Sequence, residues 1–346
     1  MKQKLRLLVF AAVSILPGAI KLPLYRWIWG ARIGRGVRVG FGAVLVFDHL
    51  RLDDGARIGW LSVIRVSSLS LGKRARMGGF LRVECHTIEM GSASTISSWV
   101  SILADHRDRR SRLVMGSECW ILDYSYVNPA RPITLGRNVG VGGGSYLFAH
   151  GLWLSKLEGY PVAHGPITIG DDVWLPWGCF ILPNVEIGAG TVIGARSLVS
   201  KSLPAGVLAA GTPAKVMREQ VVTPPTLEER NRLLLESTEE FAQYTGATLA
   251  VEESDDWTVC RVGGEPVFHL ARRPGVLAAP PPAGHALCVV HDTFGHWRAL
   301  HPRVYSLVSY QSCEYAAIGA LQRRWLAHLR LIGVRYYPVD EVQVEA

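Results

Sequence analysis

Three histidines lie in two segments that interrupt an otherwise regular pattern of apolar residues. His106 belongs to the first segment, 105–114, and His150 and His164 lie near the two ends of the second, 148–165. A neutral imidazole, with an ordinary pKa near 6.5, accepts a proton from a hydroxyl group at about neutral pH. Because loops on a rigid scaffold commonly carry functional groups, these histidines are candidates for a functional site.

The pattern that these segments interrupt has a period of six residues. In the middle of the chain it runs without a gap through Ile169, Leu175, Ile181, Ile187, Ile193 and Val199. Upstream, groups of three such residues begin at positions 33, 52, 71 and 90, a constant step of 19. A helix repeats near 3.6 residues and a half-buried strand near 2, so neither explains a step of six. The period predicts a parallel β-helix of short strands and tight corners, in which each apolar side chain stacks on its equivalent one coil away.

Residues 33–218 resemble the hexapeptide-repeat acyltransferases, and most of all those that O-acetylate sugars and cell-surface polysaccharides. The resemblance rests on Gly165–Trp174 (GPITIGDDVW), Ile187–Gly194 (IGAGTVIG) and Gly211–Val216 (GTPAKV). It implies a mainly β protein built on a left-handed parallel β-helix, assembled as a homotrimer with active sites between neighbouring β-helices. It also implies acetyl-CoA or another acyl-CoA as co-substrate, a saccharide or glycolipid as acceptor, and no metal.

In such enzymes a histidine of the loop corresponding to 148–165 takes the proton of the acceptor hydroxyl while its oxygen attacks the thioester directly. The resemblance therefore implies that His150 is the base. It follows Leu147 by three residues, whereas relatives place the histidine four or five residues after the apolar position. His164 and His106 are the alternatives. Two acids are candidates for orienting a ring nitrogen: Asp105 and Asp123.

The same resemblance implies a donor site on the last coils of the β-helix. Its positions are Trp174, Gly194, Ala195, Ser197, Lys201, Thr212 and Lys215. Lys201 and Lys215 match positions that are commonly basic in the family, and an ammonium group suits the phosphates of coenzyme A. Trp177 departs from the family pattern, and we expect its ring to pack beneath segment 148–165; a stacking surface for a sugar ring or the acyl arm is the alternative.

The first 32 residues are basic, apolar and aromatic, and we expect them to be helical. Residues 1–47 contain eight basic residues and no acidic one, so the net charge of +8 arises there and residues 48–346 are balanced. A basic patch at one end argues against nucleic-acid binding and favours peripheral contact of residues 1–30 with an anionic membrane. A helix that caps the β-helix core and a signal peptide are alternatives. Six scattered cysteines without a CxxC pair indicate buried free thiols in the cytoplasm.

Beyond residue 218 the six-residue period ends, and residues 219–346 are expected to form a separate α+β domain of unknown role. The predicted helices are 227–244 and one within 310–331, and the predicted strands are 248–251, 257–262, 267–270, 286–290 and 334–337. Two further functions remain open for the whole chain. One is an aminosugar N-acyltransferase, and the other is a non-catalytic β-helix scaffold whose C-terminal domain carries the function.

Overall fold

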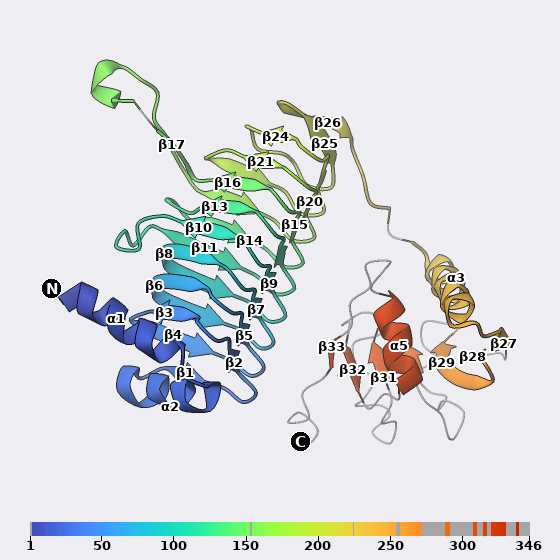
Figure 1. Ribbon diagram of the computed structural model, residues 1–346. Helices are drawn as coiled ribbons and strands as arrows, with labels where there is room; N and C mark the ends of the chain where they lie inside the picture. The colour runs from blue at the N-terminus through green and yellow to red at the C-terminus, as the bar shows by residue number, and fades with distance from the viewer. Residues whose placement is uncertain are drawn as a thin grey trace. The chain divides into compact units, whose positions relative to one another are not determined.

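The computed structural model describes residues 2–152, 154–223, 225–253, 257–271, 288–290, 307–309, 314–316, 320–329 and 337–338. The chain divides into two compact units, 1–223 and 224–346. The first unit contains a parallel β-helix (Figure 1), and the second combines a sheet with helices. The mainly β class predicted from the six-residue period is therefore confirmed.

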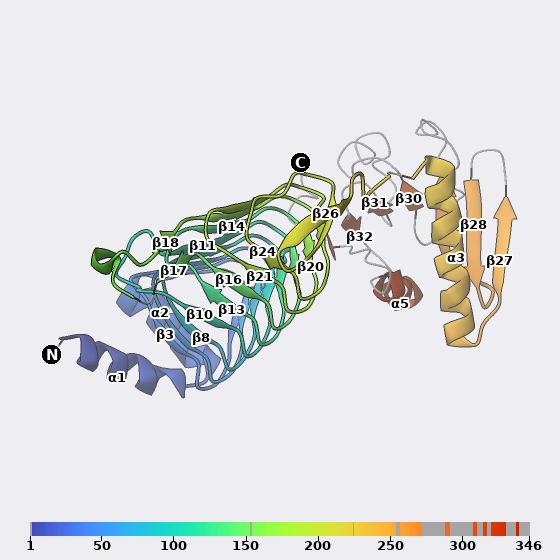
Figure 2. The ribbon, with the colours of Figure 1, turned by 90° about the horizontal axis from the view of Figure 1, so that it is seen from above.

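Two sheets form the faces of the β-helix, and each takes strands from successive coils (Figure 2). Within the described residues, the larger has fourteen strands: β1 (Arg32–Ile33), β3 (Val44–Val46), β4 (His49–Leu52), β6 (Val63–Leu71), β8 (Arg82–Met90), β10 (Ser101–Leu103), β11 (Arg112–Met115), β13 (Tyr126–Asn128), β14 (Ile133–Leu135), β16 (Tyr146–Phe148), β19 (Ile167–Ile169), β21 (Phe180–Ile181), β22 (Val185–Ile187) and β24 (Leu198–Val199). The smaller, over the same part of the chain, has ten: β2 (Arg38–Val39), β5 (Arg57–Ile58), β7 (Arg76–Met77), β9 (Thr95–Ile96), β12 (Trp120–Ile121), β15 (Gly140–Val141), β20 (Trp174–Leu175), β23 (Val192–Ile193), β25 (Leu208–Gly211) and β26 (Ala214–Arg218).

The register of the parallel strands confirms the period of six. Leu45 pairs with Ile64, Ile64 with Val83, and Val83 with Ile102, so one buried apolar side chain per coil forms a continuous column. Two further columns run through Val39, Ile58, Met77, Ile96, Ile121, Val141 and Leu175, and through Leu52, Leu71, Met90, Met115, Leu135, Ile169 and Ile187. These columns are the core of the β-helix.

Two nine-residue strands, β6 and β8, continue through a corner instead of ending there. Neither contains the glycine or proline that would break a strand. One end of β8 pairs with β10 and the other with β11. This strand therefore joins two faces of the β-helix into the single larger sheet.

A row of bulky residues holds the left-handed backbone conformation at successive corners, where glycine or asparagine is usual. Leu61, Phe80, Trp99 and Tyr124 have φ values of 51°, 56°, 61° and 62°. Such positions cost about 1 kcal/mol or more each. All four side chains are exposed, and the rings of Phe80 and Trp99 stack with centroids 4.4 Å apart. We call these four residues the corner ridge.

Two helices, α1 (Lys2–Ser14) and α2 (Gly18–Trp29), cover the first coil. Phe10 and Tyr25 are buried, and their rings pack on Phe47 with centroids 5.2 and 5.6 Å away. The capping alternative therefore describes the inner face of these helices. Leu8 of α1 and Ile20, Trp27 and Ile28 of α2 are exposed, as is Ile15 in the turn between the helices, and we call these five residues the outer face of α1 and α2. Among the described residues, no helix is long and apolar enough to cross a membrane.

Lys21, one of the eight basic residues near the start of the chain, is buried and does not face a surface. Its ammonium donates to the carbonyl oxygens of Ser14 at 3.2 Å and of Gly40 at 2.6 Å. Burial lowers the pKa of Lys21. Arg26 likewise donates to the carbonyl oxygen of Ile33. These two cations fasten the helices to the β-helix.

We expect Lys21→Met to lower the free energy of unfolding by roughly 2 kcal/mol, because two carbonyls lose a charged donor. Urea unfolding of the full chain measures this change. Arg32→Gln, at an exposed position on β1, is the matched control and should change stability by less than about 0.5 kcal/mol. Equal losses in the two variants would contradict the role of Lys21.

Four cysteines lie in the described core, and each is buried and free, as predicted: Cys85, Cys119, Cys179 and Cys260. Burial raises the pKa of each thiol, and that of Cys260 reaches about 12. The side chains of Cys288 and Cys313 lie outside the described residues. The four described thiols are therefore packing groups.

In the second unit, helix α3 (Leu227–Thr245) begins with a capping box between Thr226 and Glu229. Its sheet contains, among the described residues, β27 (Leu249–Glu253), β28 (Trp257–Val262), β29 (Glu265–Ala271), β30 (Cys288–Val290), β31 (Leu307–Ser309), β32 (Glu314–Ala316) and β33 (Tyr337–Pro338). Buried Trp325 of α5 (Ala320–Leu329) donates its Nε1–H to Thr238 of α3 at 3.0 Å.

One prediction for this unit needs correction. The helix expected within 310–331 is observed at α5, but residues 314–316 form strand β32, which pairs with β31. Strand β31 was not predicted. Both strands have only three residues, too few for an alternating pattern to be recognised.

Candidate active site

Segment 148–165 forms an arm that projects from the β-helix (Figure 1). At its base, β17 (His150–Gly151) and β18 (Ala163–His164) pair antiparallel, with His150 directly opposite His164. Their ring centroids are 6.2 Å apart. A short 3-10 helix, Lys156–Glu158, lies farther along the arm. Two of the three candidate bases are thus cross-strand neighbours.

The ring of His150 is partly buried at the root of this arm. Its Nδ1 is buried and has no hydrogen-bond partner within the described part of the chain. Burial lowers the pKa of His150, and the charges of His164 and Arg131 lower it further. The lowered pKa favours the neutral imidazole, which is the form a general base requires.

Aromatic rings on the outer face of the larger sheet lead up to His150. Tyr126 and Tyr146 stack with centroids 6.5 Å apart, and Tyr146 stacks on Phe180 at 5.5 Å. Phe148 lies 5.2 Å from Tyr126 and 6.1 Å from His150. These nearly parallel rings stack on one another in a ladder next to the candidate base, and Tyr146 is its exposed member.

His106 lies in a different environment. Its Nδ1 donates to Oε1 of Glu84 at 2.8 Å, and that carboxylate is also 3.6 Å from Arg65. Asp105, the acid expected to orient a ring nitrogen, is farther away at 3.8 Å. Asp123 lines a groove on the smaller sheet instead. Glu84 was not predicted, because only the long strand β8 brings it beside a loop 22 residues later.

Arg131 links the two interrupting segments, and sequence reasoning missed it. Strands β10 and β16, from which the segments leave the larger sheet, lie on either side of β13. From the coil between them, the guanidinium of Arg131 lies 3.7 Å from the carboxylate of Asp108 and also acts on His150. Hydrogen bonds from Arg110 lower the pKa of Asp108 to about 2, to which Arg131 adds. The sequence did hold one signal for this contact, because Arg131 lies in the coil between the two interrupting segments.

The positions expected to bind the donor lie on the last coils. Gly194, Ala195 and Ser197 form the turn between β23 and β24, and a Cβ on Gly194 would lie 2.6 Å from that of Ala210. The buried hydroxyl of Ser197 donates to the Gly194 carbonyl at 2.7 Å and accepts from the Gly211 N–H at 3.0 Å. Ser197 therefore shapes this turn from inside.

The remaining donor positions are at the surface. Lys201 follows β24, Lys215 lies on β26, and Thr212 lies in the turn between β25 and β26; all three are exposed. Trp174 of β20 is 57% exposed on the outer face of the smaller sheet. Among the described residues, no group of His, Cys, Asp or Glu is arranged to hold a metal ion.

The expectation for Trp177 was wrong. Its ring is 61% exposed and lies against the backbone of Gly143 in the preceding coil, where an added Cβ would be 2.3 Å from the ring. Glycine at this corner leaves room for the ring on the β-helix surface. Trp177 is therefore an exposed ring beside a corner and is not packed beneath segment 148–165.

No family model matches the chain, but curated proteins and solved structures are similar to parts of it. The chain is 39% identical over 112 residues to the Putative colanic acid biosynthesis acetyltransferase WcaF of Escherichia coli, a match covering 32% of this chain and 61% of that protein. It is 34% identical over 128 residues to the galactoside O-acetyltransferase of E. coli, covering 30% and 63%. The chain thus spans about three fifths of these curated relatives.

Among solved structures, the chain is similar to a hexapeptide-repeat acetyltransferase of Vibrio cholerae complexed with acetyl coenzyme A. The identity is 19% and the TM-score 0.29, over 63% of this chain and 89% of that one. For the polySia-specific acetyltransferase NeuO the identity is 18% and the TM-score 0.38, over 62% and 97%. The repeat and the curated relatives agree. The chain thus carries the hexapeptide repeat and is similar in sequence to curated acetyltransferases.

In this hexapeptide-repeat chain the candidate residues fall into separate groups. His150 and His164 come together at the arm, and Arg131 connects them to the loop that carries His106. The donor positions lie on the later coils, with Trp174 on the smaller sheet.

Proposed function

We propose that this protein is an acyl-CoA-dependent O-acetyltransferase that modifies a saccharide, with His150 as the general base. The observation that carries the proposal is the state of His150. Burial and nearby positive charge lower its pKa, its Nδ1 is buried with no partner among the described residues, and it lies beside a ladder of aromatic rings on a hexapeptide-repeat β-helix. A base that favours its neutral form, next to aromatic side chains, suits acetylation of a saccharide hydroxyl.

In the proposed reaction, His150 accepts the proton of the acceptor hydroxyl as that oxygen attacks the carbonyl carbon of the acetyl thioester. The new C–O bond forms and the C–S bond breaks. The thiolate of coenzyme A then takes the proton from the imidazolium. The products are the O-acetyl ester and the free thiol, and the base returns to its neutral state. No covalent acyl-enzyme is needed.

The donor and the oligomer are part of the same proposal. Exposed Lys201 and Lys215 would hold the phosphates of acetyl-CoA. We assign the corner ridge to subunit contact in a homotrimer, because exposed and strained apolar residues at successive corners are stabilised when they are covered. Light scattering tests this assignment, since a trimer has three times the chain mass of 38.0 kDa.

A direct assay tests the activity. The purified chain is incubated with acetyl-CoA and neutral, acidic and amino-sugar oligosaccharides, and thiol release and product mass are followed. The expected product loses its acetyl group in mild alkali, as an ester does. An alkali-stable product would identify an N-acyltransferase. No acetylated saccharide with any acceptor would favour the scaffold alternative.

We expect His164→Gln to shift the acid limb of the kcat–pH profile to higher pH. Positive charge on His164 lowers the pKa of His150, so its removal raises that pKa. His150 then becomes protonated, and inactive as a base, at a higher pH than in the wild type. A kcat–pH profile of the two proteins measures the shift. An unchanged limb, or one moved to lower pH, would argue that His150 is not the titrating base.

The outer face of α1 and α2 would contact an anionic membrane. It exposes Leu8, Ile15, Ile20 and Ile28, and Trp27 is 83% exposed. We expect the chain to co-sediment with vesicles containing phosphatidylglycerol more than with neutral ones, and Trp27→Ala/Ile28→Ala to reduce this binding several-fold. Trp177→Ala, which removes an exposed ring outside the corner ridge, is the control. Equal loss in both variants would count against the terminal helices as the contact.

A further inference from the structure

Three arginines form a row on the outer face of the smaller sheet. Arg38 pairs with Arg57 in the β2–β5 register, and Arg57 pairs with Arg76 in the β5–β7 register. All three are exposed, and none forms an ion pair with a described residue. Neighbouring strands are about 4.8 Å apart, so these like charges repel one another unless an anion lies over them.

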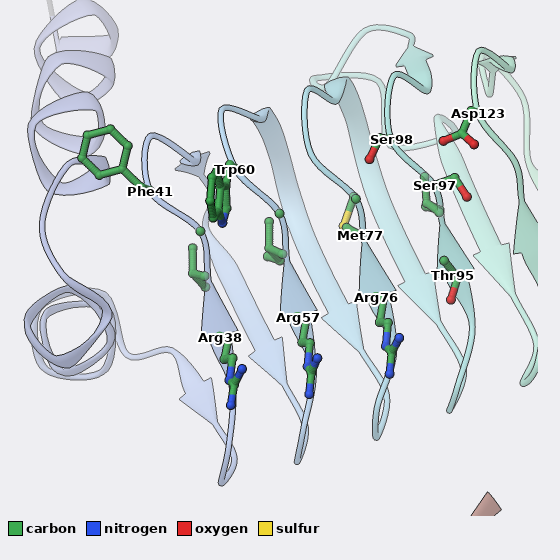
Figure 3. A pocket seen from close by; sticks show the side chains of 16 residues that line it. Arg38, Phe41, Arg57, Trp60, Arg76, Met77, Thr95, Ser97, Ser98 and Asp123 are labelled. Atoms are coloured by element: carbon green, nitrogen blue, oxygen red, sulfur yellow. The ribbon is translucent and has the colours of Figure 1, made fainter. Parts of the chain in front are cut away.

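The row is one side of a groove of about 620 Å³. In Figure 3 the guanidinium groups lie along one side, and the rings of Phe41 and Trp60 lie across the groove from them. Trp60 is 68% exposed. Glycine at position 40 makes room for this ring, because a Cβ there would lie 2.4 Å from its Cδ1.

Beyond the arginines the groove is lined by uncharged residues, except for one acid at its far end. Thr95 continues the arginine row on β9, and Ser97 and Ser98 follow it (Figure 3). Asp123 lies at the far end of the groove. The groove therefore offers cations at one end, hydroxyl groups in the middle and one acid at the limit.

We propose that this groove binds an anionic saccharide chain. Guanidinium groups bind carboxylate, sulfate or phosphate oxygens through paired N–H donors, and three in register match acid groups repeated along a chain. The exposed face of Trp60 receives a sugar ring, and the hydroxyls of Thr95, Ser97 and Ser98 receive sugar hydroxyls. A nucleic acid is a poorer match, because residues 48–346 carry no net charge to support a long polyanion.

The groove and Trp174 lie on one face. From Arg76, the same outward position continues through Thr95, Trp120 and Gly140 to Trp174 in successive strands. A chain held by the arginines would therefore lie along the face that carries a candidate donor residue. The further step, that the bound saccharide is also the acetyl acceptor, rests on the proposed function. The binding of an anionic saccharide to the groove does not.

Binding is tested without acetyl-CoA, by calorimetry on the full chain with hexagalacturonate, maltohexaose and a single-stranded DNA hexamer. We expect hexagalacturonate to bind, maltohexaose to bind at least about tenfold more weakly, and affinity to fall between 50 and 200 mM salt. Arg57→Gln should weaken binding about tenfold, as loss of a charged hydrogen bond predicts. Trp60→Ala should weaken it as well. Arg82→Gln, an exposed arginine on the larger sheet, should leave it unchanged.

Equal binding of the two hexasaccharides would overturn the proposal, and so would equal losses in Arg57→Gln and Arg82→Gln. Tighter binding of the DNA hexamer would replace a saccharide with a nucleic acid as the ligand. A His150→Gln variant must still bind hexagalacturonate, because the groove is independent of the base. If the wild-type chain binds hexagalacturonate but transfers acetyl to no acceptor, the proposed function is rejected and the saccharide site is kept.

Discussion

Replacing His150 with glutamine is expected to lower kcat for acetyl transfer by about 10²- to 10⁴-fold, the range for loss of a general base. Glutamine retains a polar side chain of similar length, so the β17–β18 pairing should persist. Because His150 takes the proton only as the acceptor attacks, the affinity for acetyl-CoA should change little. Steady-state kinetics with a saturating acceptor, and a thermal titration with acetyl-CoA, separate these two quantities.

The controls for this prediction are two other histidines. His49→Gln, at an exposed position on β4, should keep kcat within a few-fold of the wild type. His106→Gln is the discriminating variant, because His106 is held by Glu84 in an arrangement that also suits a base. A large loss in His106→Gln with normal activity in His150→Gln would move the catalytic centre to the His106–Glu84 pair.

The second large effect is expected for the donor. Acetyl-CoA at 100 times its dissociation constant should stabilise the wild-type chain by about 2.7 kcal/mol. We expect Lys201→Ala/Lys215→Ala to lose most of this stabilisation at the same concentration, since both exposed ammonium groups would face phosphates. Thermal unfolding with and without acetyl-CoA measures the difference.

The control for the donor prediction removes the same charge elsewhere. Arg32→Ala/Arg82→Ala changes two exposed cations on the larger sheet and should keep the full stabilisation. If both double variants lose it equally, the effect of the lysines is one of net charge and not of a site. If acetyl-CoA, longer acyl-CoA and free coenzyme A at millimolar concentration all leave the wild-type midpoint unchanged, the transferase proposal fails.

The β-helix could be predicted from the sequence because each coil contacts only its neighbours. A step of 19 residues places Leu45, Ile64 and Val83 in register inside the β-helix. The same step places Arg38, Arg57 and Arg76 in register outside it, so the repeat determines both the core column and the arginine row. The sequence also predicted the helix at 227–244, observed as α3, and the free buried cysteines, the latter from the absence of a CxxC pair. It also suggested which segments leave the coil, since a break in the period is itself visible.

What lies within and between those segments was decided only by the tertiary structure. A segment outside the period carries no register, so the pairing of His150 with His164 depends on how the arm closes. The Glu84–His106 bond depends on a strand that continues through a corner, and the Arg131–Asp108 contact on three neighbouring strands. Burial of Lys21 likewise needs the helices and the first coil together. These contacts join residues distant in sequence, whose approach no local period encodes.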